Sequence, residues 1–279
     1  MKKNQIKFTG GLRKTTTDNR DFKLGSIFGL PGLSELPPTF EYEVPEIRNQ
    51  GDTDFCSAFS TCYASEIQEG NNIEPSYSFA LSKLISGDVN GWGQDIRSAL
   101  KAHVKYGALC KQDSPYSLEN KDAQFLRDIK NWPNLFDKAK INQKQSFFKV
   151  TGQYDHFDNI RASMWKFKDD KRAVVFGSVW SWPITQTFMD KYGTDGFGHM
   201  MCITGWNDKG LIITNSIGQS NPKQTFTREV INQAVDEYGA YMFIDIPHNK
   251  AQNMIKFGIT EEDGWFKAVL KTLATYLWK

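Results

Sequence analysis

A chain of 279 residues, of which 39% are hydrophobic and 14% aromatic, can bury a substantial core and is unlike a disordered protein. Its 34 basic and 32 acidic residues leave a net charge of +2, which argues against a nucleic-acid partner. The mean hydropathy is −0.51 and no apolar run could span a bilayer, and the polar, basic residues 4–23 do not look like a secretory signal.

The cysteines and histidines exclude two further classes. Four cysteines are too few for a disulfide scaffold in a chain of this size, and no CxxC motif occurs. The four histidines are scattered, so a structural zinc site is not expected. We expect no metal and no cofactor.

Residues 1–36 are predicted to be an extended N-terminal arm. The first 25 residues carry seven basic and two acidic side chains and show no helical period. Glycines and prolines at 24–38 then lead into a domain expected to span 37–250.

The first half of this domain, 37–150, is predicted to be mainly helical. Phe59, Tyr63 and Ile67 recur at steps of four in a predicted helix over 56–69, with Asp52, Thr53 and Asp54 before it as candidate caps. Further helical patterns cover 94–105, part of 121–139, and 159–168.

The second half, 151–250, is predicted to consist mainly of strands, at 173–180, 199–206, 211–215 and 240–246, with a helix over 227–238. The sequence Asn207-Asp-Lys-Gly210 between two of these strands is typical of a tight turn. Helices first and strands second indicate an α+β fold with a cleft between the halves.

Residues 251–279 are predicted to form a C-terminal amphipathic helical extension. Apolar residues recur along 265–279 at helical spacing, with Lys267, Lys271 and Lys279 off the stripe. The helix could pack on its own domain, or it could dock onto a protein partner or a membrane surface.

Only cysteine nucleophile chemistry has support among the common catalytic motifs. The sequence contains no GxxxxGK[ST], no GxGxxG after a strand, no GxSxG and no HExxH. Cys56 opens a predicted helix, where the macrodipole should lower the pKa of its thiol. For Cys62, Cys110 and Cys202, an inert buried thiol is the better interpretation.

His199 and Asn215 supply the partners that such a thiol needs. His199 begins one predicted strand and Asn215 ends the next, so an antiparallel hairpin brings them together. Asn215 could accept a hydrogen bond from one ring nitrogen while the other faces Cys56, a Cys-His-Asn arrangement. Gln50, six residues before Cys56, could complete an oxyanion hole with the Cys56 N–H.

These motifs resemble those of the papain-like cysteine peptidases, in a bacterial or phage-type branch. Residues 48–60, RNQGDTDFCSAFS, are similar to the family pattern NQGxCGSCWAFS. Residues 198–216 resemble the family's histidine strand, turn and KNSWG strand, and 93–116 resemble a helix and (W/Y)PY turn of the bacterial branch. The resemblance covers about 37–247 and implies a helical left half and an antiparallel β-barrel-like right half.

The resemblance also implies site residues. Cys56, His199, Asn215 and Gln50 would be catalytic, and peptide substrate would contact Asp54, Phe55, Gly93, Gln94 and Gly198. A carboxylate at Asp54 would favour substrates with Lys or Arg before the scissile bond, unless its side chain caps the helix instead.

Several departures from the family pattern bear on activity. Asp54-Phe55 replaces Gly-Ser before the nucleophile, and Ile217 replaces the tryptophan that shields the His–Asn pair. Thr53 replaces a half-cystine and Gly91 stands where its partner is expected, so the usual disulfides would be absent. That absence favours a reducing, cytoplasmic or particle-associated location. With about 36 residues before the expected domain, we also do not expect the long prodomain of secreted members.

Two functions follow. One is a cysteine endopeptidase that hydrolyses peptide bonds in a peptide or protein substrate. The other is a papain-fold binding or structural component of a larger assembly with weak or no activity, favoured by the Asp54, Phe55 and Ile217 departures. The complete Gln-Cys-His-Asn set favours the enzyme.

Overall fold

The computed structural model describes the greater part of the chain, and the account below is confined to that part. The described residues are 11–14, 18, 21–51, 53–89, 93–115, 133–179, 198–218 and 223–257. The predicted C-terminal helix over 265–279 and all of 116–132 lie outside these ranges.

Three helices form one side of the molecule: α1 (Cys56–Glu69), α2 (Pro75–Ser86) and α3 (Ile96–Tyr106). Local signals explain their ends, since Asp95 caps α3 through the Ser98 N–H and Gly70 and Gly87 end α1 and α2 in left-handed conformation. The short α5 (Pro133–Ala139) lies beside them. Because Gln94–Asp95 form strand β3, α3 begins two residues later than its pattern predicted.

Nine strands in the described part of the chain form one sheet. The main path runs β3-β1-β6-β5-β9-β4, while β2 and β7 also pair with β6, and β8 pairs with β7. Beyond β3, the strands are β1 (Leu12–Arg13), β2 (Phe40–Glu41), β4 (Ser146–Lys149), β5 (Val174–Val179), β6 (Gly198–Asn207), β7 (Gly210–Thr214), β8 (Lys223–Phe226) and β9 (Ala240–Ile244).

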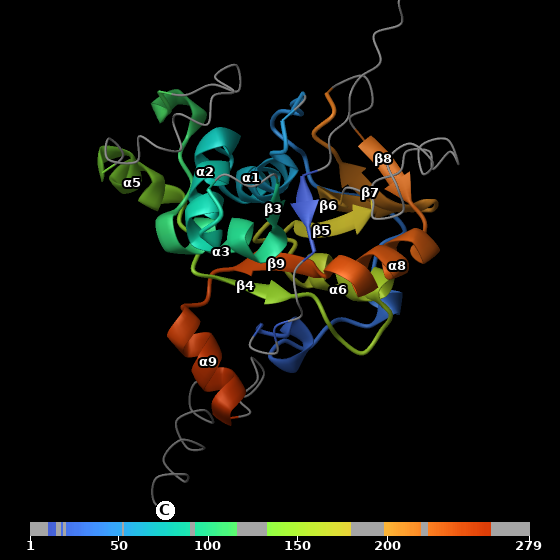
Figure 1. Ribbon diagram of the computed structural model, residues 1–279. Coiled ribbons are helices and arrows are strands. Elements are labelled where there is room, and N and C mark those ends of the chain that lie inside the picture. The colour runs from blue at the N-terminus through green and yellow to red at the C-terminus, as the bar shows by residue number, and fades with distance from the viewer. Residues whose placement is uncertain are drawn as a thin grey trace, which may run out of the picture.

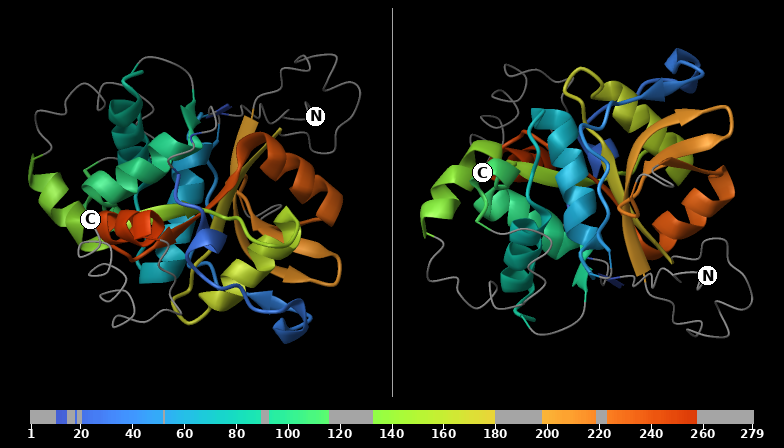
Figure 2. Two further views of the ribbon diagram at one scale, coloured as in Figure 1. Left: turned by 90° about the horizontal axis from the view of Figure 1, so that it is seen from below. Right: turned by 90° about the horizontal axis from the view of Figure 1, so that it is seen from above.

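Two helices cover the sheet on the side away from α1, α2 and α3. Helix α8 (Arg228–Tyr238) packs on β5, and α6 (His156–Lys166) packs on α8 and β6. Figure 2 shows α1–α3 on one side of the strands and α6 and α8 on the other in both views. Helices first and a curled sheet second confirm the predicted α+β fold with a helical part and a half-barrel part (Figure 1).

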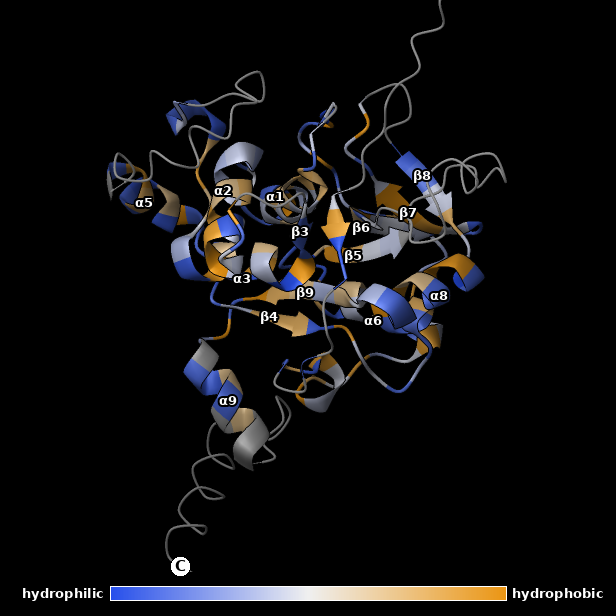
Figure 3. Ribbon diagram, viewed as in Figure 1, coloured by the Kyte–Doolittle hydropathy of each residue, from blue (hydrophilic) through white to orange (hydrophobic). Residues whose placement is uncertain are grey.

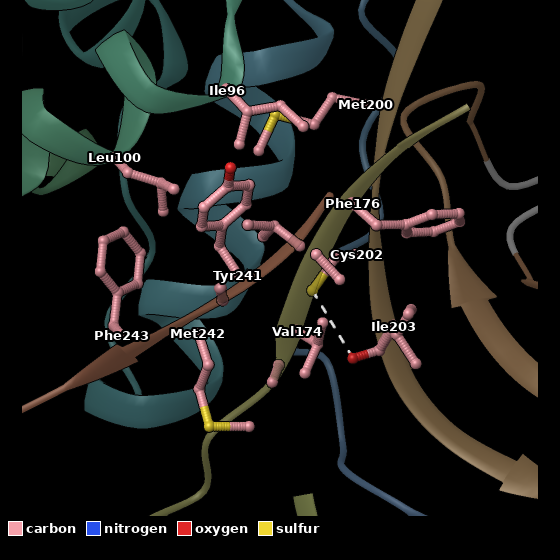
Figure 4. Packing of buried hydrophobic residues seen from close by; sticks show 14 of the residues in the cluster. Ile96, Leu100, Val174, Phe176, Met200, Cys202, Ile203, Tyr241, Met242 and Phe243 are labelled. Atoms are coloured by element: carbon pink, nitrogen blue, oxygen red, sulfur yellow. Dashed lines mark hydrogen bonds between the residues drawn. The ribbon is translucent and has the colours of Figure 1, made fainter. Parts of the chain in front are cut away.

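The core lies where the helices meet the sheet. In Figure 4, Ile96 and Leu100 of α3 face Tyr241 and Phe243 of β9, with Met200 of β6 close by. All five side chains are at most 5% exposed. Burial of this kind contributes roughly 1.5–3 kcal/mol per large apolar side chain and fixes how α1 and α3 sit against β6.

Both ends of the described chain also contact the domain. Leu12 pairs with both β3 and β6, and Phe22, Leu24, Ile27 and Phe28 join the hydrophobic core, so much of the segment predicted as an extended arm is packed into the fold. At the other end, helix α9 (His248–Phe257) buries Ala251 and Met254 and is mainly hydrophilic in Figure 3, whereas β4 and β9 are mainly hydrophobic.

Candidate active site

The β6–β7 hairpin brings His199 and Asn215 together. Asn207 Oδ1 accepts hydrogen bonds from the N–H groups of Lys209 and Gly210, which stabilises the turn. The two strands then pair in antiparallel register from Asn207↔Gly210 to Cys202↔Thr214. His199 Nε2 lies 2.8 Å from Asn215 Oδ1, so the ring is oriented from the end of the neighbouring strand.

Cys56 lies at the first residue of α1, which packs against β6. The backbone N–H of Met200, the residue after His199, points to the Cys56 sulfur, which places the thiol beside the histidine strand. No side chain caps α1 in the predicted way: its N-cap residue is Phe55, and Asp52 is outside the described residues. The prediction that Thr53 or Asp54 caps this helix is therefore wrong, because both side chains bond elsewhere.

Gln50 lies in a buried loop between α1 and the end of β7. Its Nε2 donates to Thr53 O at 2.8 Å, and its Oε1 accepts from Ser216 Oγ at 2.5 Å. Its backbone N–H also donates to Ser216 O, at 2.8 Å. Because Ser216 follows Asn215, these bonds hold the Gln50 loop against the strand that orients His199.

Burial controls the protonation of the two reactive groups. It raises the pKa of the Cys56 thiol to about 11, with a smaller contribution from the Asp54 carboxylate, against the N–H groups of Met200 and Gly11. Burial also lowers the pKa of His199 to about 4, although the Asn215 bond opposes this. The expected net lowering of the Cys56 pKa is not found in this closed site, because burial outweighs the N–H groups at the start of α1, and thiol and imidazole are both neutral at pH 7.

The substitution of Ile217 for the family's tryptophan does not open the pair to water. His199 is 0% exposed and Asn215 is 1% exposed. Asn215 Oδ1 also accepts from the Ser216 N–H at 2.8 Å, and its Nδ2 lies 3.4 Å from Gln224 Oε1. The amide is thus fixed by its neighbours as well as by the imidazole.

Strand β1 lies across the thiol. Leu12 pairs in parallel with Gln94 of β3 and in antiparallel with Gly198 of β6, so β1 bridges the two sides of the molecule above Cys56 (Figure 1). The Gly11 N–H points to the Cys56 sulfur. A Cβ at Gly11 would lie 2.1 Å from Asp54 O, so only glycine fits at this point.

Four of the five residues predicted to bind substrate lie beneath or beside β1. Gln94 N–H donates to Gly11 O at 2.7 Å, and Gly198 pairs with Leu12. The Asp54 carboxylate accepts from the Gly93 N–H. The fifth, Phe55, is 8% exposed and its ring stacks on Phe79 at 4.1 Å.

A second buried thiol and imidazole occur in the helical half. Cys62 of α1 and His103 of α3 lie on helices that pack together. Burial raises the Cys62 pKa, and Cys62 Sγ donates to Ser78 Oγ at 3.4 Å. The pKa of His103 is lowered to about 3, and neither ring nitrogen has a hydrogen-bond partner among the described residues. Among the described residues, no side chain orients His103 by a hydrogen bond, and no extended segment lies over Cys62 as β1 lies over Cys56. Cys62 and His103 are therefore a weaker candidate for a catalytic pair than Cys56 and His199.

The sequence patterns missed α2 and the residues that it supplies. Lys83 of α2 is 2% exposed, and its Nζ donates to Gly93 O at 2.5 Å. The signal for the helix was present, since Glu74 precedes Pro75 at the start and Gly87 follows the end. Nothing in the spacing linked Lys83 to the site.

In the part of the chain that the structure describes, His, Cys, Asp and Glu side chains form no group of three or more that could hold a metal ion. None of the helices within the described ranges combines the length and the apolar character needed to cross a bilayer. All four cysteines are free.

Comparison with known proteins supports the fold. No family model and no curated protein sequence matches the chain. Among solved structures, xylellain, a cysteine protease from Xylella fastidiosa, is similar with a TM-score of 0.66 and 18% identity over 88% of this chain and 98% of that one. Trypanosoma congolense procathepsin B S9 gives 0.56 with 12% identity over 85% and 87%. Tenebrio molitor procathepsin L 3 gives 0.54 with 14% over 80% and 73%. The chain has the papain-like cysteine protease fold.

Proposed function

We propose that the protein is a cysteine endopeptidase that uses Cys56, His199, Asn215 and Gln50. The observation that carries this proposal is the 2.8 Å bond between His199 Nε2 and Asn215 Oδ1. Met200, the residue after His199 in β6, directs its N–H to the Cys56 thiol. A nucleophile, a base and an orienting amide from three elements thus converge. This inference concerns the site, because similarity below 25% identity extends to the fold only.

The proposed reaction follows from the ring orientation. Since Nε2 bonds to Asn215, Nδ1 would take the thiol proton as Cys56 Sγ attacks the scissile carbonyl carbon. The imidazolium then returns that proton to the amine as the C–N bond breaks. Water, deprotonated by the imidazole, hydrolyses the thioester and releases the acid and the free thiol.

Gln50 would stabilise the oxyanion with the Cys56 N–H. One hydrogen of its amide bonds to Thr53 O, and an amide NH₂ carries a second hydrogen that can serve the oxyanion. The Ser216–Gln50 bond holds the amide in this orientation.

A substrate must take the place of β1. Cys56 is 0% exposed, and the group of β1 that meets its sulfur is an N–H of Gly11 rather than a carbonyl carbon. The thiol is therefore covered by Gly11 and the strand that follows it. Once β1 leaves, water reaches the thiol and the imidazole, which lowers the pKa of Cys56, raises that of His199 and favours the reactive ion pair.

The closed site is also the observation that favours the alternative, a papain-fold binding protein without peptidase activity. Such a protein would need strands β3 and β6, which pair with β1, but it would not need a reactive thiol. The two functions therefore differ in the reactivity of Cys56.

The test combines labelling with turnover. Brief iodoacetamide treatment at neutral pH, followed by mass spectrometry, should label Cys56, through molecules from which β1 has been displaced, ahead of the other two buried thiols, Cys62 and Cys202. The protein should also hydrolyse a fluorogenic peptide library. Cys56→Ser should lose turnover, whereas the matched control Cys62→Ser should keep it. Turnover that persists in Cys56→Ser, or an inert wild type that still alkylates at Cys56, would overturn the proposal.

A further inference from the structure

The cleft edge formed by β3 consists of only two residues, so side chains must hold it in place. It pairs with β1 through Leu12↔Gln94 and Arg13↔Asp95, and the peptide unit between Gly93 and Gln94 supplies one hydrogen bond at the start of this pairing. The N–H of this unit, on Gln94, donates to Gly11 O at 2.7 Å. The same N–H is available to any extended peptide that replaces β1.

Lys83 holds the opposite end of that peptide unit. Its Nζ donates to Gly93 O at 2.5 Å from beneath the edge. The C=O and N–H of a trans peptide point in opposite directions, so fixing the Gly93 oxygen aims the Gln94 N–H into the cleft. A cation on the carbonyl also polarises the peptide and makes its N–H a stronger donor.

Asp54 holds the preceding N–H. Its carboxylate accepts from the Gly93 N–H, so both polar groups of Gly93 are bonded to charged side chains. Gly93 has a φ of 67° and a Cβ there would lie 2.1 Å from Gly11 O, so glycine is needed for the close approach.

The Asp54 carboxylate also acts on the charge of Lys83. Burial lowers the pKa of Lys83, and the Asp54 and Asp88 carboxylates oppose that change. Arg13 of β1 adds a repulsive charge. Removing Asp54 therefore makes the protonated form of Lys83 less favourable, and it also removes the hydrogen bond to the Gly93 N–H.

We propose that Lys83 and Asp54 are positioning residues that clamp Gly93 and so present the Gln94 N–H to the backbone of a bound peptide. The inference rests on the proposed peptidase function and assigns these residues to peptide binding rather than to bond cleavage. It also gives Asp54 a role different from both earlier expectations, helix cap and pocket wall for a basic side chain.

The experiment compares two reagents for the same thiol in the full chain. A peptidyl chloromethyl ketone of four residues needs the β3 edge to bind, whereas iodoacetamide does not. The measured quantity is the rate of Cys56 labelling by the peptidyl reagent divided by its rate of labelling by iodoacetamide. We expect Lys83→Met and Asp54→Ala to lower this ratio about tenfold, the scale for losing a charge-assisted hydrogen bond. In turnover, KM should rise while kcat changes little.

Matched variants separate positioning from general damage. Lys83→Gln keeps an N–H donor for Gly93 O and should recover part of the ratio, and Asp54→Asn keeps an acceptor and should do the same. Lys101→Met removes an exposed lysine of α3 and should leave the ratio unchanged. Circular dichroism and peptide mapping detect unfolding, which would expose all four thiols to iodoacetamide.

The outcomes distinguish this inference from the proposed function. If both Lys83→Met and Asp54→Ala kept the wild-type ratio of labelling rates, the positioning role of these residues would be refuted. The proposed peptidase function would be unaffected. A fall in kcat at unchanged KM would also refute the positioning role. A wild type whose Cys56 reacts with iodoacetamide but never with the peptidyl reagent, and which hydrolyses no peptide, would overturn the peptidase.

Discussion

The two edges of the cleft are built differently. On the strand side, β6 runs unbroken from Gly198 to Asn207 and is hydrogen-bonded to four other strands. On the helical side, β3 is two residues long, and its place depends on α2 and on the loop before Cys56. The first edge is fixed by backbone pairing, and the second by the buried Lys83 and the half-buried Asp54.

This difference indicates how the two edges divide the work. Proton transfer needs a base held within fractions of an ångström, and His199 stands on the edge with the most backbone bonds. Binding an extended peptide requires an edge that can release one strand and accept another. Four experiments test this division of work.

The strand edge should show the largest effect. His199→Ala removes both the base and the acid, so turnover should fall by about 10³-fold or more, whereas Asn215→Ala should cost less because β6 still places the imidazole. Rates on a fluorogenic peptide, with circular dichroism as the folding control, measure both. Near wild-type turnover in His199→Ala would show that the strand edge does not carry the chemistry.

The junction between the edges depends on a buried ion pair. Arg48 precedes Gln50 and its Nη2 lies 2.5 Å from Glu66 Oε1 on α1, with side chains 6% and 0% exposed. Arg48→Met leaves the carboxylate buried without a charged partner, although the Ile73 N–H still donates to it, so the free energy of unfolding should fall by about 3–5 kcal/mol at pH 8. Urea denaturation measures it.

The pH dependence of that loss has a defined sign. Burial raises the pKa of Glu66 to about 7 even with Arg48 present. Without Arg48 it rises further, so the folded variant binds a proton that the unfolded chain releases, and stability falls as pH rises above the unfolded value of about 4.5. The loss should therefore be smaller at pH 5 than at pH 8, and equal losses would contradict the assignment.

Displacing β1 should show how readily the helical edge releases a strand. In Gly11→Val the added side chain collides with Asp54 O, because even its Cβ would lie 2.1 Å away. Opening the site should raise the rate of Cys56 alkylation at pH 7 about tenfold or more, on the scale of local opening free energies.

The same variant should shift the alkylation pH profile. Because burial raises the Cys56 pKa to about 11, its midpoint should move down when water enters. Gly32→Ala serves as the control, since a Cβ there meets only side-chain oxygens, of Glu35 at 3.2 Å and of Ser34 at 3.7 Å. An unchanged rate and midpoint in Gly11→Val would mean that β1 does not cover the thiol.

The smallest effect is expected at the rim. Arg13 of β1 pairs with Asp88, but the two side chains are 37% and 42% exposed. Solvent screens such a pair, which contributes less than about 1 kcal/mol, so Arg13→Ala should change Cys56 alkylation by less than about fivefold. A larger change would mean that the surface pair, rather than backbone pairing, retains β1.

The sequence was informative where neighbours in space are linked by a short turn. The Asn207–Gly210 turn predicts that His199 and Asn215 meet, and helical spacing predicts α1 with Cys56 at its start. The helix-then-strand order predicts the fold class in the same way. Each of these inferences needs only local rules.

What could not be predicted depends on distant pairing or on burial. Gly11 and Gly93 are far apart in the chain, and no periodic pattern links a two-residue strand to its partner. Lys83 looked like an ordinary lysine in a segment with no recognised helix. The sign of the Cys56 pKa shift was missed because the helix dipole can be inferred from position, whereas burial by β1 cannot.

The link between Asp54, Gly93 and Lys83 contains no sulfur, and all four cysteines of the chain are free. A thiol nucleophile needs a reductant to stay active, and a reductant opens any accessible disulfide near it. If Cys56 is the nucleophile, as proposed, a reductant that keeps it active would leave the bonds that hold β3 unchanged.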